Sequence, residues 1–194
     1  MTRSHSYSSR IAPAVPPLDA DVQHAIDEVM RGNPPLTLFT VMARDRRLFQ
    51  RYFGGGLLDR GHLTLRHREI VIDRTTARCH AEYEWGVHVT TYAAKAGLTE
   101  TQIVSLTHGR SDDGCWGEDE AALIDLCDQL HDHATVDGEL WERLSAYFAE
   151  EAVLELLLLV GFYHSTSFIV NSLELPLEVG MARFTDYPAQ PVAS

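Results

Sequence analysis

The stretch Arg68–Gly97, REIVIDRTTARCHAEYEWGVHVTTYAAKAG, contains the residues that decide the fold and the site. Its second half places Ala81, Glu84, His88 and Tyr92 at positions i, i+3, i+7 and i+11. At about 100° per residue, these four positions fall within a sector of about 80° on one face of a helix. A carboxylate, an imidazole and a phenol can therefore face the same pocket.

The first half of the stretch predicts a second, more buried helix. Glu69 and Asp73 lie one turn apart among the apolar residues Ile70, Val71 and Ile72. Two acidic side chains in such a stripe can supply a second carboxylate from the other side of the pocket.

The order of these residues resembles the carboxymuconolactone decarboxylase and alkylhydroperoxidase D-like superfamily. The resemblance rests on Glu69, the AEYE motif after eleven intervening residues, His88 after three more, and AAKAGLT. In the peroxidase branch the signature is E-x11-C-x2-C-x3-H, a redox dithiol served by a glutamate and a histidine. On this chain the two cysteine positions hold Ala81 and Glu84. Tyr83 stands at a position that is sometimes a proton-relay histidine in that branch.

The YEW..H form that begins at Tyr83 is similar to the decarboxylase-like branch. The resemblance is specific over about thirty residues and extends loosely from Leu36 to Pro176. It implies an all-helical fold and an oligomer, and it implies no particular substrate.

The composition excludes several classes of partner. The chain has 194 residues, 45% of them hydrophobic, which is enough for one domain with a full core. Its 16 basic and 28 acidic residues give a net charge of −12, which repels nucleic acids and anionic membranes. The N-terminus lacks the pattern of a signal peptide, and the three cysteines lack C-x-x-C spacing. We therefore expect a soluble, cytoplasmic protein that binds a small molecule.

Helical periodicity and capping residues predict an all-α bundle of six to eight helices in residues 18–180, between flexible tails at 1–17 and 181–194. Thr99, for example, is expected to cap a short helix with Gln102 in its first turn. The predicted helices cover about 20–31, 36–53, 66–77, 80–96, 99–106, 118–133, 137–149 and 151–173.

The last of these helices is apolar on most of its circumference. The unbroken apolar run, Leu156–Tyr163, is too short to span a membrane. Such a helix is typical of a bundle core or of a subunit interface. Together with the resemblance, it predicts a homo-oligomer: a dimer, a trimer or a hexamer.

Glu69, Glu84 and His88 are the candidate catalytic residues. An imidazole exchanges protons near neutral pH, so His88 suits proton transfer to or from a substrate. Glu84 would orient His88 or act as a second base. Burial would raise the pKa of Glu69 and make it an acid. The simpler alternative is that Glu84 and His88 form an ordinary ion pair on a helix surface.

Tyr83, Trp85, Tyr92 and His164 are the candidate substrate-binding residues. Trp85 and Tyr92 flank the catalytic stripe, and His164 would line the pocket from the apolar C-terminal helix. For each of them, packing in the core is the alternative. Tyr83 lies about 200° from Ala81 on the helical wheel, which favours core packing or a contact with the Glu69 helix or a neighbouring subunit.

We expect no metal and no cofactor. His80, Glu84 and His88 follow one another at intervals of four, so the two histidines lie about 80° apart on a helix, and no second ligand helix is evident. Cys79 lies close to a helix N-terminus, but it has no second cysteine at the required spacing. We interpret it as a structural thiol.

The residues and the resemblance leave three alternative hypotheses for the function. The first is a lyase or isomerase that decarboxylates, isomerises or cyclises a small carbonyl or lactone compound by acid–base chemistry. The second is a thiol-dependent alkylhydroperoxidase with an antioxidant role, which Ala81 and Glu84 disfavour. The third is a non-catalytic, oligomeric ligand-binding protein. The sequence leaves open the substrate, and which carboxylate is the acid and which the base.

Overall fold

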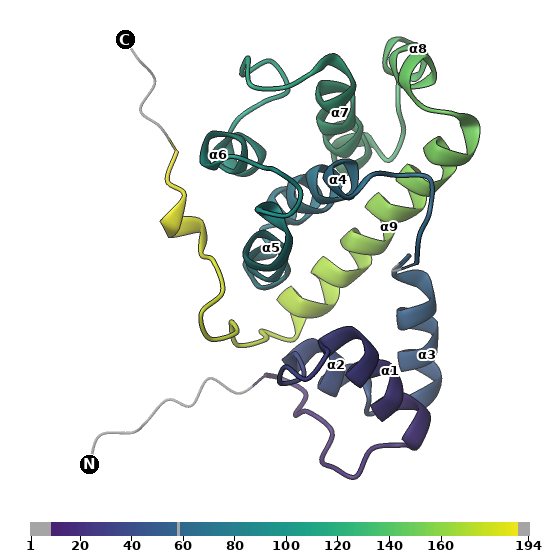
Figure 1. The fold of residues 1–194 in the computed structure, drawn as a ribbon, viewed down its shortest axis with the longest axis vertical. Helices are drawn as coiled ribbons and strands as arrows, with labels where there is room; N and C mark the ends of the chain where they lie inside the picture. Colours follow the sequence, from purple (N-terminus) through teal and green to yellow (C-terminus); the bar gives the residue numbers. More distant parts are fainter. Residues whose placement is uncertain (1–8, 58, 190–194) are drawn as a thin grey trace.

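The computed structural model describes residues 9–57 and 59–189, and all regular elements within them are helical (Figure 1). This confirms the all-α prediction. The nine α-helices of the described chain are α1 (Ala20–Met30), α2 (Thr37–Met42), α3 (Arg46–Gly55), α4 (Leu65–Arg78), α5 (Glu82–His88), α6 (Glu100–His108), α7 (Glu118–His133), α8 (Gly138–Tyr147) and α9 (Glu150–Ser172). A π-helical turn, η1 (Val89–Ala93), follows α5, and a short 3-10 helix, η2 (Phe184–Asp186), lies near the C-terminus.

The helix expected over 36–53 is divided into α2 and α3, which is one reason why the helices outnumber the prediction. Asp45 between them has an extended backbone, and its side chain accepts a hydrogen bond from the backbone N–H of Leu48 at 2.9 Å. An aspartate in this position is a strong N-cap, so it starts a new helix instead of continuing the old one.

Helix α4 is the centre of the bundle and packs against α5, α6, α7 and α9. All of its residues from Glu69 to Ala77 are buried. Among them is Arg74, whose guanidinium donates two hydrogen bonds to Asp128 on α7, at 2.8 and 2.6 Å. It also donates to the carbonyl of Leu106 on α6, at 3.0 Å. A buried, bidentate arginine thus fixes α4 against two neighbouring helices.

Helix α9 runs across the bundle and packs on α4, α5 and α8 (Figure 1). By length and composition alone it could cross a membrane, but half of its most apolar window is buried inside the protein. Its packing is that of a core helix. The side of α9 that faces away from the bundle is exposed and carries Leu154, Leu158 and Phe168.

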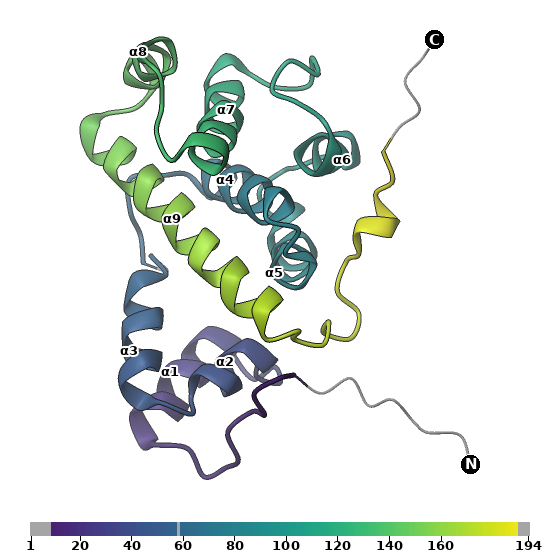
Figure 2. The same ribbon diagram turned by 180° about the vertical axis from the view of Figure 1, so that it is seen from behind.

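Helices α1 to α3 form a separate layer at one end of the bundle, next to α5 and α9 (Figures 1 and 2). The layer has a small apolar core of its own, made of Val22, Ile26 and Phe49. It connects to the bundle through the chain before α1, where the N–H of Arg10 donates to the carbonyl of Leu173 at 2.8 Å.

The C-terminal segment also packs on the bundle. The N–H of Ala182 donates to the hydroxyl of Thr90 at 2.7 Å, and that of Phe184 to the carboxylate of Glu82 at 2.9 Å. Gly86 permits this approach, because a Cβ atom there would collide with the carbonyl oxygen of Ala182. The described parts of the two expected tails, 9–17 and 181–189, therefore contact the bundle. Residues 1–8 and 190–194 lie outside the described chain.

Candidate active site

Helix α5 starts later and ends earlier than the helix expected over 80–96. His80 has a left-handed backbone, with φ 51°, so the helix begins after it. After His88 the chain enters the π-helical turn η1. Turns of this kind inside a helix are uncommon and often accompany functional sites. Glu84 and His88 still lie one turn apart on the same side of α5.

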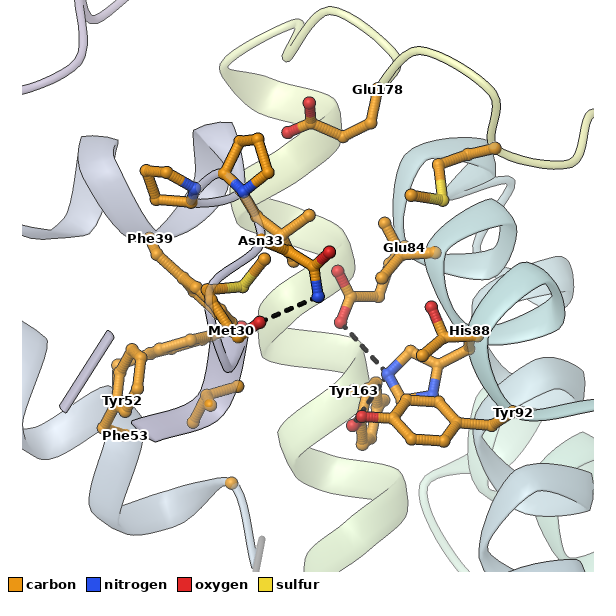
Figure 3. A pocket seen from close by; sticks show the side chains of 18 of the residues that line it. Met30, Asn33, Phe39, Tyr52, Phe53, Glu84, His88, Tyr92, Tyr163 and Glu178 are labelled. Atoms are coloured by element: carbon orange, nitrogen blue, oxygen red, sulfur yellow. Dashed lines mark hydrogen bonds and ion pairs between the residues drawn. The ribbon is translucent and has the colours of Figure 1, made fainter. Parts of the chain in front are cut away.

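His88 is the centre of a buried cluster that joins three helices. Its Nδ1 atom lies 2.9 Å from Oε2 of Glu69 on α4. Its Nε2 atom lies 3.1 Å from the hydroxyl of Tyr163 on α9 and 3.5 Å from Oε1 of Glu84 (Figure 3). The structure thus brings the three predicted catalytic residues together, and it adds Tyr163, which was not among the predicted residues. The sequence signal for this residue is that Tyr163 is a tyrosine in the apolar run Leu156–Tyr163.

The charges around His88 favour its protonated form. Burial by itself would lower the pKa of this imidazole. The charges of Glu69 and Glu84 and the hydrogen bonds to them outweigh burial, so the pKa of His88 lies well above its ordinary value. His88 is therefore an imidazolium at neutral pH, with one N–H directed at Glu69 and the other available to Glu84 and Tyr163.

Asp73 is the acidic residue that holds its proton. It is fully buried, and among the described residues neither of its carboxyl oxygens has a hydrogen-bond partner. Burial, and then the charge of Glu69, raise the pKa of Asp73 well above its usual range. The two carboxyl groups differ in their contacts, because Glu69 is paired with His88 and Asp73 is not. The predicted role of Glu69 as an acid stays a prediction.

A cavity of about 610 Å³ opens beside the cluster, between the α1–α3 layer and helices α5 and α9 (Figure 3). One wall is polar and includes Glu84, His88, Tyr92 and Tyr163. The other wall is mostly apolar and comes from the α1–α3 layer: Met30, Pro34, Pro35, Leu36, Phe39 and Phe53. A pocket of this size and lining is typical of small-molecule sites.

The second oxygen of Glu84, Oε2, has no hydrogen-bond partner among the residues described. Glu84 lines the cavity, and its Oε2 atom is a buried acceptor that is not used by the described residues. The opposite side contributes Tyr52, whose hydroxyl lies 3.1 Å from that of Thr166. Burial, and then the charge of Glu84, raise the pKa of Tyr52, so its phenol stays protonated.

Of the four candidate substrate-binding residues, Tyr92 lines the cavity, with its ring 5.4 Å from that of His88. Tyr83 lies outside the lining. Its hydroxyl donates to Glu178 at 2.6 Å and accepts from the N–H of Leu38 at 3.1 Å. Tyr83 thus joins α5 to the start of α2 and to the C-terminal segment. This position agrees with its angle of about 200° from Ala81 on the helical wheel.

Trp85 and His164 also lie outside the cavity lining formed by the described chain. Trp85 is fully buried against Phe184, with ring centroids 4.7 Å apart, because it projects from the side of α5 that the C-terminal segment covers. His164 points from α9 toward His131 on α7. Neither position supports the predicted contact with substrate.

The sequence profile of the carboxymuconolactone decarboxylase family matches residues 46–124, which contain α4, α5 and the cluster around His88. Residues 46–124 of the chain are thus similar to the carboxymuconolactone decarboxylase family. No curated protein is similar enough in sequence to count as a match.

Several solved structures share the fold of this chain at low sequence identity. A peroxidase-related protein from Ralstonia eutropha JMP134, described as an alkylhydroperoxidase AhpD core, has a TM-score of 0.78 at 17% identity, covering 91% of this chain and 95% of the other. A peroxidase-related protein from Silicibacter sp. TM1040 has a TM-score of 0.76 at 12% identity, covering 92% and 96%.

A variant of the debrominase Bmp8, in complex with 2,3,4-tribromopyrrole, has a TM-score of 0.71 at 12% identity, covering 92% and 95%. At these identities the similarity establishes the shared helical architecture. Activity depends on the cluster and the cavity of this chain, because one fold can support many functions.

Proposed function

We propose that the chain is a cofactor-independent acid–base enzyme that decarboxylates, isomerises or cyclises a small carbonyl or lactone compound. The observation that carries this proposal is the arrangement at His88. Its Nδ1 atom is held by Glu69 at 2.9 Å, while its Nε2 atom faces Glu84 and Tyr163 at the wall of the cavity.

This arrangement suits a proton donor and a proton acceptor that act together. The imidazolium of His88 is the general acid and donates from Nε2 to a substrate oxygen. Glu84 is the general base, because it lines the cavity next to His88 and its Oε2 atom has no hydrogen-bond partner among the described residues. The carboxylate of Glu69 keeps the ring in place and stabilises its positive charge. Tyr163 can donate a hydrogen bond to a developing oxyanion.

The cavity favours a small, partly apolar substrate with a carbonyl group. Its volume of about 610 Å³ accommodates a compact organic molecule. The apolar wall from α1–α3 excludes water from one side, which strengthens the electrostatic interactions on the other. Bmp8, of the same fold, was solved with a small halogenated pyrrole. This supports a small, planar organic compound as the class of ligand.

A thiol-dependent peroxidase is the alternative that the peroxidase-related neighbours favour. A dithiol peroxidase needs two cysteines close enough to form a disulfide beside the acid–base cluster. Cys79, Cys115 and Cys127 are all free thiols, and within the described part of the chain none of them lines the cavity. The geometry therefore favours acid–base chemistry.

Deuterium exchange tests the proposed function before the substrate is known. The chain is incubated in D2O with a panel of small keto acids and lactones, and exchange of the carbon-bound protons next to the carbonyl is followed by NMR. Exchange with at least one compound is expected. His88→Gln and Glu84→Gln should each slow it by about 10²–10⁴-fold.

Glu100→Gln, at an exposed position of α6, is the matched control and should exchange at the wild-type rate. No exchange and no conversion with any member of the panel would contradict the proposal. The same conclusion would follow if both cluster variants kept the wild-type rate.

We also propose that the chain forms a homo-oligomer through the exposed face of α9. Leu154, Leu158 and Phe168 are 62%, 64% and 65% exposed, and Gly161 and Ser165 continue the same stripe between them. Exposed apolar residues at such spacing are typical of helix–helix interfaces. A cytoplasmic location is a further proposal, supported by the three free thiols.

A further inference from the structure

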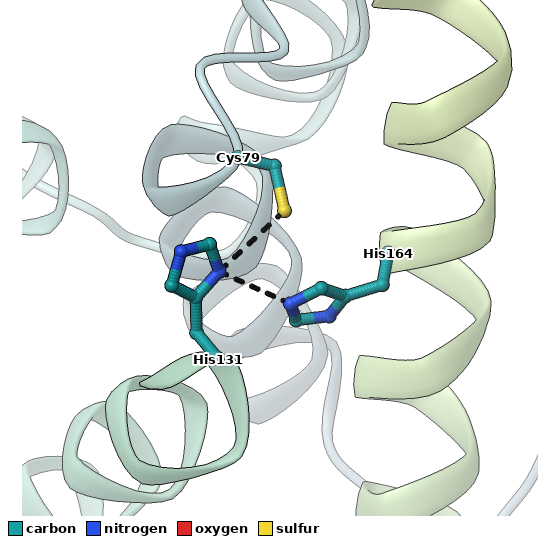
Figure 4. Close-up of side chains that lie close together, drawn as sticks. All are labelled: Cys79, His131 and His164. Carbon is teal, nitrogen blue, oxygen red and sulfur yellow. Dashed lines mark hydrogen bonds between the residues drawn. The ribbon is translucent and has the colours of Figure 1, made fainter. Parts of the chain in front are cut away.

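A second cluster of reactive side chains lies outside the cavity lining. Cys79 follows the last residue of α4, His131 lies in the last turn of α7, and His164 lies in the middle of α9 (Figure 4). The Nδ1 atom of His131 is 3.7 Å from Sγ of Cys79 and 3.1 Å from Nε2 of His164. The three ligand atoms all lie within 4.8 Å of one another.

The backbone fixes the orientation of one imidazole. Nδ1 of His164 lies 2.9 Å from the carbonyl oxygen of Val160, so this nitrogen carries a proton and donates it. The lone pair of Nε2 is then directed at the cluster. Histidines that bind metal ions usually have their second ring nitrogen held in this way by a carbonyl or a carboxylate.

The spacing of the ligand atoms is close to that of a tetrahedral zinc site. Zinc–sulfur bonds of about 2.3 Å and zinc–nitrogen bonds of about 2.0–2.1 Å, at tetrahedral angles, separate sulfur from nitrogen by about 3.6 Å and two nitrogens by about 3.3 Å. The separations of 3.7 and 3.1 Å around His131 agree with these values. The third pair, Sγ of Cys79 and Nε2 of His164, lies within 4.8 Å.

We propose that Cys79, His131 and His164 form a binding site for a zinc-like divalent ion. A thiolate and two imidazoles are the ligand types that zinc prefers, and together they fill three of its four positions. All three residues are only half-buried, so a water molecule or an external ligand can reach the fourth position. Neither the cavity nor the acid–base cluster is part of this site.

The fold holds the three ligands in place without an ion. The carbonyl of Cys79 accepts a hydrogen bond from Nδ2 of Asn171 on α9 at 2.9 Å, and its N–H donates to the carbonyl of Thr75 at 3.0 Å. Helix α4 packs directly on α7 and on α9, which carry the two histidines. Removing the ion should therefore leave the bundle folded.

Metal titration of the full chain tests this site. The purified protein is stripped with a chelator and titrated with Zn²⁺ against a chromogenic chelator, and with Co²⁺ followed by absorbance. One equivalent of each ion should bind, and Co²⁺ should give a thiolate-to-metal charge-transfer band. Cys79→Ser should abolish that band. His131→Gln and His164→Gln should weaken Zn²⁺ binding by at least about 10–100-fold.

Cys115→Ser and His133→Gln are the matched controls, because Cys115 is another half-buried thiol and His133 is an exposed histidine on the same helix as His131. Both should bind zinc as the wild type does. A stripped protein that shows no saturable, one-equivalent binding would overturn the proposal. Binding that survives in Cys79→Ser would also overturn it.

A measurement on the wild-type protein covers the case in which a variant does not fold. Zn²⁺ should slow alkylation of Cys79 by iodoacetamide, mapped by mass spectrometry, and should leave the alkylation rate of Cys115 unchanged. Equal rates at Cys79 with and without Zn²⁺ would contradict the site.

Discussion

The Nδ1 atom of His88 lies 2.9 Å from Oε2 of Glu69, and both side chains are almost completely buried. The two residues are 19 positions apart in the chain and come from different helices. A buried charge is strongly unfavourable without a partner, and the Glu69 carboxyl provides one for the His88 imidazolium. This pair keeps a charged imidazole at the polar wall of the cavity.

Removing the carboxylate of Glu69 should make His88 lose its proton at lower pH. In Glu69→Gln the dominant attraction is gone, and burial then lowers the pKa of His88. An NMR titration of the histidine ring resonances, in the wild type and in the variant, measures this change. Glu100→Gln should leave the pKa of His88 where it is. A His88 pKa that is the same in Glu69→Gln and in the wild type would contradict the proposed pairing.

Replacing Asp73 by asparagine should change how stability depends on pH. An unfolded chain releases the Asp73 proton near pH 3.9, approximately the ordinary value, whereas the folded chain keeps it to higher pH. Between these two pKa values the folded state binds more protons, so the free energy of unfolding falls as pH rises. Asp73→Asn has no carboxyl group at this position, so its free energy of unfolding does not fall with pH for this reason.

Urea unfolding of both proteins between pH 4 and pH 8 measures this effect. Above the pKa of Asp73 in the unfolded chain, the free energy of unfolding of Asp73→Asn relative to the wild type should rise by about 1 kcal/mol per pH unit. This rise should continue as long as Asp73 stays protonated in the folded wild type. Asp112→Asn, at an exposed position, should follow the wild type throughout. A constant difference between wild type and Asp73→Asn would show that the carboxyl titrates normally.

Thiol-dependent peroxide reduction should be absent or marginal. The positions of the two redox cysteines in the peroxidase signature hold Ala81 and Glu84, a methyl group and a carboxylate. Consumption of an alkyl hydroperoxide in the presence of dithiothreitol should be as slow in the wild type as in Cys79→Ser. Robust turnover that disappears in Cys79→Ser would make the chain a peroxidase.

Leu158→Glu should disrupt the proposed oligomer. The substitution places a charge in the middle of the exposed apolar stripe of α9, where desolvating it in an interface is unfavourable. Sedimentation at micromolar concentration should show a larger assembly for the wild type and a shift toward monomer for the variant. Leu48→Glu, at an exposed leucine of α3, is the control and should sediment as the wild type does. A wild-type monomer would refute the proposal.

The sequence by itself determined the features that depend on neighbouring residues. Thr99 was predicted to cap a helix, and its hydroxyl accepts from the N–H of Gln102 at 3.3 Å, because capping involves residues three positions apart. Helical spacing likewise put Glu84 next to His88. Glu69 was placed opposite them by resemblance to the superfamily, and the structure brings it to 2.9 Å from His88.

Only the tertiary structure decided which groups complete the two clusters. Tyr163 lies 75 positions from His88, and His131 lies 52 from Cys79 and 33 from His164, so no local spacing announces these contacts. The proton on Asp73 is likewise a tertiary property. The pKa of a carboxyl depends on burial and on charges that other helices bring close, and neither is a property of the sequence around it.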